Sequence, residues 1–206
     1  MGREDPAPRI TSLDQFRGYT VLGMFLVNFA GGFVVLPETI RHHHTHFSYA
    51  DSIMPQFLFA VGFALRLVFL RKWQTAGPWG AYHRAFVRVA GLLLVGLVVH
   101  GLTGGVGSWD ELCQLGVGGF FRTAFQRGPF ETLTHIAVTS LWVLPVIAAG
   151  PLVRIAWAVG SAVLFWYLSL WHGYYTWEVT RPGIDGGPLG FLTWTIPLLV
   201  GSLAYD

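Results

Sequence analysis

Charged residues are scarce in this sequence. Only 12% of its 206 residues are Asp, Glu, Lys or Arg, whereas an average soluble domain has about 25%. A soluble protein of this length needs charge to cover its surface, yet 53% of these residues are hydrophobic and the mean hydropathy is +0.51. The formal net charge is only +2 with the histidines neutral, which is too small to indicate nucleic-acid binding. The composition therefore indicates an integral membrane protein.

Cysteine and the common catalytic motifs are also lacking. The single cysteine, Cys113, excludes an internal disulfide and a cysteine-rich metal site. The sequence contains no Gly-rich phosphate loop, no His-Glu-x-x-His and no Gly-x-Ser-x-Gly. Residues 1–9 are polar and lack the apolar region and cleavage site of a signal peptide. We therefore expect the first helix to act as an uncleaved insertion signal.

The hydrophobic residues gather in blocks of membrane-spanning length. A helix needs about 20 apolar residues to cross about 30 Å of hydrocarbon. The six predicted spans cover residues 19–36, 53–70, 87–102, 133–149, 152–170 and 189–204. A short loop around Gly77 and Pro78 separates the second span from the third. Residues 109–127 are too polar to span, and they predict an amphipathic segment in the membrane interface. The expected fold is an all-α membrane protein, a bundle of about six transmembrane helices.

The loops between these blocks differ in positive charge. The N-terminal tail and the loops after the second and fourth blocks hold seven Lys and Arg residues, whereas the opposite loops hold four. Positively charged loops favour the cytoplasmic side. We therefore expect a multi-pass protein with a cytoplasmic N-terminus and an extracytoplasmic loop after the first block. Arg66, near the cytoplasmic end of the second block, is expected to extend to the lipid headgroups.

Polar residues at membrane depth are candidates for function because their burial is costly. Asn28 lies within the first block, where it either bonds to another helix or projects into a substrate cavity. Asp14 and Arg17 lie one helical turn apart before this block. They form either a modest salt bridge or a site where Arg17 holds a phosphate through bidentate donors. His100 and His135 are interpreted as packing residues or as partners in hydrogen bonds between helices.

The loop after the first block carries a run of histidines. His42, His43, His44 and His46 lie shortly before Asp51, which stands at the start of the second block. The run is a solvated loop without chemistry, a metal site, or the source of one general base or acyl carrier. Neighbouring side chains in a loop do not all reach one ion, so no metal is expected. Asp51 either orients the ring of one histidine or is only a favourable charge at a helix start.

The first 70 residues carry several separate motifs in a fixed order. These are S-L-D-Q-F-R-G at residues 12–18, V-N-F-A-G-G at 27–32, the histidine loop, and Y-A-D-S-I-M-P-Q-F-L-F-A-V-G at 49–62. Together they resemble the opening of the heparan-α-glucosaminide N-acetyltransferase family of multi-spanning acyltransferases.

The resemblance implies acetyl transfer across the membrane. Acetyl-CoA would bind from the cytoplasmic side, and a histidine near the far face would help pass the acetyl group to an amino sugar or other glycan acceptor. Asn28 and Asp51 match the family's active-site asparagine and aspartate, and Asp14 and Arg17 match its opening motif, which we assign to the cofactor. The histidine corresponds best to His42 and next best to His43, whose loop is longer than the family's.

The family has more spans than this sequence. We therefore expect residues 1–206 to be a single transmembrane acyltransferase-like domain that is truncated at its C-terminal side. Its expected partners are the lipid bilayer, acetyl-CoA and the acceptor, with a homodimer as an open question and no nucleic acid. A multi-span transporter and a non-catalytic membrane scaffold remain the alternative functions. Direct transfer and an acetyl-enzyme are both compatible with the sequence.

Overall fold

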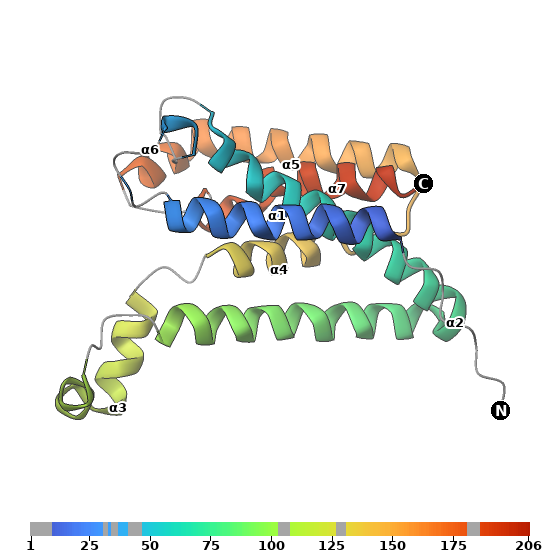
Figure 1. The fold of residues 1–206 in the computed structure, drawn as a ribbon. Helices are drawn as coiled ribbons and strands as arrows, with labels where there is room; N and C mark the ends of the chain where they lie inside the picture. The colour runs from blue at the N-terminus through green and yellow to red at the C-terminus, as the bar shows by residue number, and fades with distance from the viewer. Residues whose placement is uncertain are drawn as a thin grey trace, which may run out of the picture.

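The computed structural model describes residues 10–30, 33, 37–40, 47–102, 108–126, 131–180 and 186–206. All regular elements in these segments are helical, which confirms the all-α prediction (Figure 1). The α-helices are α1 (Thr11–Ala30), α2 (Tyr49–Leu102), α3 (Trp109–Gln126), α4 (Thr132–Val143), α5 (Pro151–Trp171), α6 (Tyr174–Val179) and α7 (Phe191–Ala204). Two short 3-10 helices are η1 (Glu38–Ile40) and η2 (Gly187–Leu189).

The second and third predicted spans form one long element, α2, which folds back at Gly77. Gly77 has a φ of 71° and a ψ of −179°, a conformation that glycine adopts readily and other residues rarely do. Pro78 follows it and lacks the N–H that would continue the helical hydrogen bonding. The expected loop is therefore a sharp turn between two helical halves, which Figure 1 shows in teal and green.

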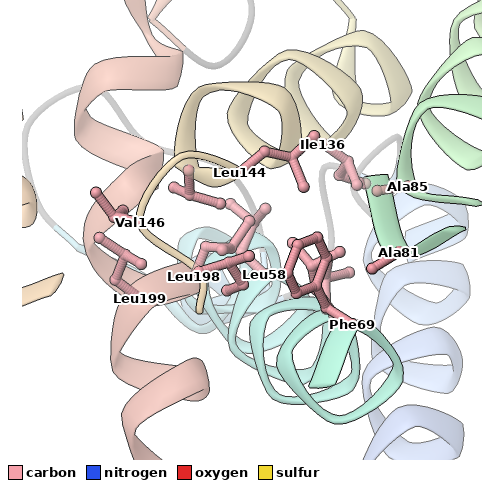
Figure 2. Packing of buried hydrophobic residues seen from close by; sticks show 13 residues of the cluster. Leu58, Phe69, Ala81, Ala85, Ile136, Leu144, Val146, Leu198 and Leu199 are labelled. Atoms are coloured by element: carbon pink, nitrogen blue, oxygen red, sulfur yellow. The ribbon is translucent and has the colours of Figure 1, made fainter. Parts of the chain in front are cut away.

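The hydrophobic core lies mainly between the first half of α2, α4 and α7 (Figure 2). Leu58 on α2, Ile136 on α4 and Leu198 on α7 are each at most 2% exposed. The backbones of α2 and α7 touch at Gly62, where an added Cβ would lie 1.8 Å from the carbonyl oxygen of Leu198. Small residues allow membrane helices to approach closely, because lipid provides little hydrophobic force between them.

The helix α1 runs antiparallel to the first half of α2. Phe16, near the start of α1, packs against Phe59 with ring centroids 5.8 Å apart. Gly23, one to two turns further along α1, lies beside Tyr49 at the start of α2. The end of α1 and the start of α2 therefore share one end of the bundle.

The first half of α2 runs parallel to α7. Phe63 packs edge-on against Tyr205 with centroids 5.4 Å apart, and Pro55 shares a groove with Thr193. We call the end that holds the start of α2 and the start of α7 the Asp51 end. The opposite end, which holds the start of α1 and the end of α7, is the Asp206 end. Figure 1 shows α6 at the Asp51 end.

Three helical segments in the described part of the chain are long and apolar enough to cross a membrane. They are Tyr49–Gly96, which contains two predicted spans, Pro151–Trp171 and Gly187–Ala204. The helix α4 is apolar but shorter than its predicted span, because it ends at Val143, shortly before Pro145. The protein is therefore a multi-pass integral membrane protein, and the total of six spans stays a prediction.

The predicted interfacial segment forms a helix, α3, as expected. It bends at Gly116, where φ is 64°. Its location in the membrane interface stays a prediction.

Candidate functional site

Asp51 is fixed at the start of α2 by a capping arrangement. Ser48 precedes the first helical residue, and its backbone N–H and its hydroxyl both donate to Asp51 Oδ2 at 2.9 Å. Ser48 is buried and Asp51 is half-buried. These bonds form one half of a capping box, in which the side chain of the third helical residue accepts from the N-cap backbone N–H. Asp51 therefore lies in the first turn of α2 with a carboxylate of defined orientation, and its role towards a histidine stays a prediction.

His42 and His43 lie outside the described residues, as do His44 and His46. Their pairing with Asp51 stays a prediction. Before this run, the described chain reaches Ile40, which packs against the cluster of Val27, Ala50 and Ile53 at the start of α2. The described residues that flank the histidine loop on both sides therefore lie at the Asp51 end.

Asn28 occupies the same end of the bundle but faces away from α2. Its neighbour Val27 is 3% exposed and packs against Ala50 and Ile53, whereas Asn28 itself is exposed. The Asn28 side chain forms no hydrogen bond with another residue that the structure describes. The described residues therefore do not bring the Asn28 and Asp51 side chains together.

Asp14 and Arg17 lie at the opposite, Asp206 end. Arg17 Nη1 is 4.0 Å from Asp14 Oδ1, and the two side chains are 38% and 56% exposed. A pair of this kind stabilises a helix little. Arg17 also lies close enough to Arg88, together with Arg84, to repel its positive charge. Arg17 therefore belongs to a group of arginines at the end where α1 begins.

An ion-pair network that includes two buried arginines lies at the Asp206 end. Arg66 Nε and Nη2 donate to the two carboxylate oxygens of Asp206 at 2.7 and 3.1 Å, and Arg154 Nη2 also donates to Oδ2. Arg66 Nη1 donates to the carbonyl oxygen of Ile147. Arg154 Nη1 donates to the carbonyl and hydroxyl oxygens of Ser202 at 2.8 and 3.0 Å. The network joins α2, the segment before α5, α5 and α7.

This network contradicts the prediction made for Arg66, and it lowers the pKa of Asp206. Arg66 is only 7% exposed, so the expectation that it extends to the headgroups is wrong, because a carboxylate is available inside the bundle. Burial alone would raise the pKa of the Asp206 carboxyl, but the hydrogen bonds and charges of Arg66 and Arg154 hold it below its ordinary value.

Two ionisable residues on α6 were not singled out from the sequence. The Tyr174 hydroxyl donates to the carbonyl oxygen of Gly186 at 2.8 Å and accepts from the N–H of Leu189 at 2.9 Å. Burial raises the pKa of Tyr174, aided by the charge of Glu178, against the Leu189 hydrogen bond. Burial also raises the pKa of Glu178. The sequence of this region is rich in aromatic residues, among them Trp171, Tyr174, Tyr175 and Trp177.

An open, apolar groove lies between α1, α2 and α7. Its volume is about 700 Å³. Its lining includes Phe16 of α1, Gln56 and Phe59 of α2, and Thr193 and Pro197 of α7. Because α1 and α2 are antiparallel, the groove leads from the level of Phe16 towards the turn of α2 that holds Asp51.

The expected packing role of His135 agrees with its burial, since it is 0% exposed within α4. The His100 side chain lies outside the part of the chain that the structure describes.

Residues 9–177 match the family model of the heparan-alpha-glucosaminide N-acetyltransferase catalytic domain. This range includes the Asp14, Arg17, Asn28 and Asp51 positions and the histidine run. Neither the curated proteins nor the solved structures gave a significant match to the chain.

Proposed function

Because the chain belongs to the heparan-alpha-glucosaminide N-acetyltransferase family, we propose that it moves an acetyl group from cytoplasmic acetyl-CoA to an amine on the far side of the membrane. Membership itself makes the chain an acetyl-CoA-dependent N-acetyltransferase of the membrane. The acceptor in our proposal is an amino sugar or another glycan amine.

The separation of the polar residues between two ends of the bundle is the observation that supports this direction of transfer. Arg17 and its neighbouring arginines lie at the Asp206 end, where phosphates of a cytoplasmic cofactor would meet positive charge. Asp51 lies at the other end, beside the points where the histidine loop joins the described chain. A donor held at one end and an acceptor at the other would meet near Asp51.

The proposed chemistry uses one histidine of the loop, His42 or His43. The acceptor nitrogen attacks the thioester carbonyl carbon, the C–N bond forms, and the C–S bond breaks to release the CoA thiolate. The histidine takes the proton that the nitrogen loses and then gives it to the leaving thiolate. Asp51 accepts a hydrogen bond from the other ring nitrogen and stabilises the imidazolium. Asn28 is exposed on α1 and faces away from α2, so its role as an active-site residue stays a prediction.

An acetyl-enzyme route differs only in the first step. The histidine nitrogen itself would attack the thioester carbonyl carbon, and the C–S bond would break to release the CoA thiolate. The acceptor amine would then attack the acetyl carbon and break its bond to the histidine, which takes the amine proton. Radiolabelled acetyl-CoA supplied without acceptor separates the two routes, because only the second leaves label on the protein.

The test of the proposed function uses inverted membrane vesicles that contain the full chain and are loaded with glucosamine. Radiolabelled acetyl-CoA is added outside, which corresponds to the cytoplasmic face. We expect labelled N-acetylglucosamine inside the vesicles and none in vesicles without the chain. Absence of label from both the sugar and the protein would overturn the proposal.

The proposed topology has a cytoplasmic N-terminus and α3 outside. Cys113 is exposed on α3, so a membrane-impermeant maleimide should label it in intact cells. Cys113→Ser is the control for specificity. In the same background, Gln74→Cys near the Gly77 turn should react only after permeabilisation. Labelling of Gln74→Cys but not of Cys113 in intact cells would invert the topology. One truncated domain over residues 1–206 and a homodimer stay predictions.

A further inference from the structure

The groove between α1, α2 and α7 offers almost no polar group to an occupant. Its two polar residues are engaged within the protein: Gln56 Nε2 donates to the hydroxyl oxygen of Ser52 at 3.1 Å, and the Thr193 hydroxyl donates to the carbonyl oxygen of Gly190 at 2.8 Å. Gln56 Oε1 is itself buried. A sugar, a nucleotide or an amide in the groove would therefore lose its hydrogen bonds to water without replacement. The chemistry of the walls fits a hydrocarbon chain.

The groove continues the lipid-facing surface of the protein. Ile196 and Val200 line the groove on α7 and are 41% and 48% exposed, in a helix that is long and apolar enough to cross a membrane. A lipid chain can therefore enter the groove sideways from the bilayer. Because lipid tails are as apolar as the walls, little hydrophobic free energy favours the groove over the bilayer. The groove would hold a chain in position rather than extract it from the membrane.

The level of the groove along the bundle gives such a chain a direction. The groove begins at Thr193 on α7 and at Pro55 on α2, which follows Asp51 by one helical turn on the same face. From Thr193 to Val200 it extends about 10 Å, against a hydrocarbon thickness of about 30 Å. A lipid whose chain lies there has its head group at the Asp51 end, which is extracytoplasmic in the proposed topology.

Carboxylates lie at the head-group end. Asp51 is half-buried and is oriented by Ser48. Glu178 of α6 is also half-buried and lies beside the segment that leads into α7, since a Cβ added to Gly186 would lie 3.7 Å from Glu178 Oε1. Negative groups at this end are complementary to the ammonium of a primary amine. The groove and its end therefore match an amphiphile with a hydrocarbon chain and an amine in its head group.

We infer that the acceptor is a lipid with an amino-sugar head group, whose hydrocarbon chain lies in the groove and whose amine lies near Asp51. The inference rests on the proposed function and names the class of its acceptor. The ammonium loses a proton to water, and the neutral nitrogen attacks the thioester carbonyl carbon. The C–N bond forms, the C–S bond breaks, and the nitrogen's proton passes through the histidine to the CoA thiolate. The groove accelerates transfer by positioning the amine.

The first test measures binding without catalysis. The full chain in lipid nanodiscs is irradiated with a dodecyl glucosaminide that carries a diazirine in the middle of its chain. We expect the label on residues 191–204 and its loss when unmodified dodecyl glucosaminide is added in excess. The matched probe is the corresponding dodecyl glucoside, which has a hydroxyl in place of the amine. Equal labelling by the two probes would show that the groove takes any bilayer lipid and would overturn the inference, as would labelling elsewhere only.

The second test measures acetyl transfer to two acceptors that share one head group, methyl glucosaminide and dodecyl glucosaminide. Ile196→Trp fills the groove from its exposed side. Ile155→Trp is the matched control, because Ile155 lies on α5, is 46% exposed and does not line the groove. We expect Ile196→Trp to lower the ratio of kcat/KM for the dodecyl over the methyl acceptor at least about tenfold, since the amine is no longer positioned. Ile155→Trp should leave this ratio unchanged.

The outcomes separate this inference from the proposed function. If the wild type acetylates both acceptors and Ile196→Trp keeps the wild-type ratio, the lipid acceptor is wrong and the function stands. If Ile196→Trp lowers transfer to both acceptors equally, the residue acts on the fold and the groove assignment also fails. If the wild type acetylates neither acceptor, the proposed function is overturned, and the cross-linking still decides whether the groove selects an amino-sugar lipid.

Discussion

The two ends of the bundle hold their carboxylates in different ways. At the Asp206 end, two guanidinium groups engage both oxygens of Asp206, and Arg154 is fully buried. At the Asp51 end, the amide and hydroxyl of Ser48, both neutral donors, bind Asp51 through Oδ2. A carboxylate between two cations is suited to fastening helices, whereas one that is oriented by neutral donors can still act on a histidine. The difference agrees with our proposal that one end fastens the helices and the other carries the chemistry.

The same substitution at the two ends should therefore have opposite consequences. Asp51→Asn keeps an oxygen that can accept from Ser48, but it removes the charge that would stabilise an imidazolium. We expect acetyl transfer to fall about 10²–10⁴-fold, with little change in the melting temperature. Radiolabel transfer and thermal unfolding of the purified chain measure the two effects. Activity within tenfold of wild type would remove Asp51 from the proposed mechanism.

Asp206→Asn is the counterpart at the other end. It leaves Arg66 and Arg154 buried without their carboxylate, a loss of about 3–5 kcal/mol for a fully buried pair. Because the Asp206 side chain is 33% exposed, we expect a smaller loss of about 2–4 kcal/mol. The residual activity per folded molecule should stay near that of wild type. Equal unfolding free energies for Asp206→Asn and wild type would contradict the fastening role.

The pKa of Asp206 adds a pH dependence to that end. A carboxyl whose pKa is lower in the folded state contributes stability above its unfolded pKa and loses it as the pH falls through the folded pKa. Because the unfolded pKa is about 3.9, the network should be fully effective at neutral pH and weaken below about pH 4. Melting temperatures between pH 7 and pH 3 should fall more steeply in wild type than in Asp206→Asn. Parallel curves would show that Asp206 does not titrate as inferred.

Ser48→Ala tests the hydrogen bonds by which the uncharged donors of Ser48 orient Asp51. The change removes the hydroxyl that donates to Oδ2 and the N-cap side chain, which costs about 1 kcal/mol. Acetyl transfer should fall more than stability alone explains, because the carboxylate loses part of its orientation. Ser48→Thr keeps a capping hydroxyl and should restore both values. Full activity in Ser48→Ala would show that the capping arrangement serves only the helix.

Glu178→Gln should have the smallest effect. A carboxyl with a raised pKa favours its protonated form in the folded protein, so its contribution to stability is lost as the pH rises through the folded pKa. The neutral amide should therefore raise the melting temperature slightly at neutral pH, and the gain should disappear below about pH 4. A gain that is independent of pH would exclude ionisation of Glu178 as its cause.

Local features of the fold could be predicted well from the sequence. Gly77 and Pro78 indicated a break, which is a sharp turn at Gly77. The ends of α5 lie within a residue of those expected from hydropathy. By contrast, Arg66 was assigned to the headgroups, because its partner Asp206 lies 140 residues away along the chain. Nothing in a single sequence connects such a pair.

The candidate site was predictable only in part. The motifs around Asp14, Arg17, Asn28 and Asp51 are short and contiguous, so the family and its chemistry could be inferred from them. The groove could not be predicted, because it depends on α7 facing Gln56 and Phe59 of α2. Tyr174 was likewise unremarkable until its hydroxyl was found between Gly186 and Leu189.

The sequence by itself determined that this is a helical membrane protein of an acetyl-CoA-dependent family. Hydrophobicity acts over runs of about 20 residues, and motifs of a few residues carry the family pattern, so both can be read along the chain. Only the tertiary structure decided which charges pair, which side chains line the groove, and which ends of the helices share a side. Those properties arise from contacts between distant segments, and packing of the whole bundle fixes them.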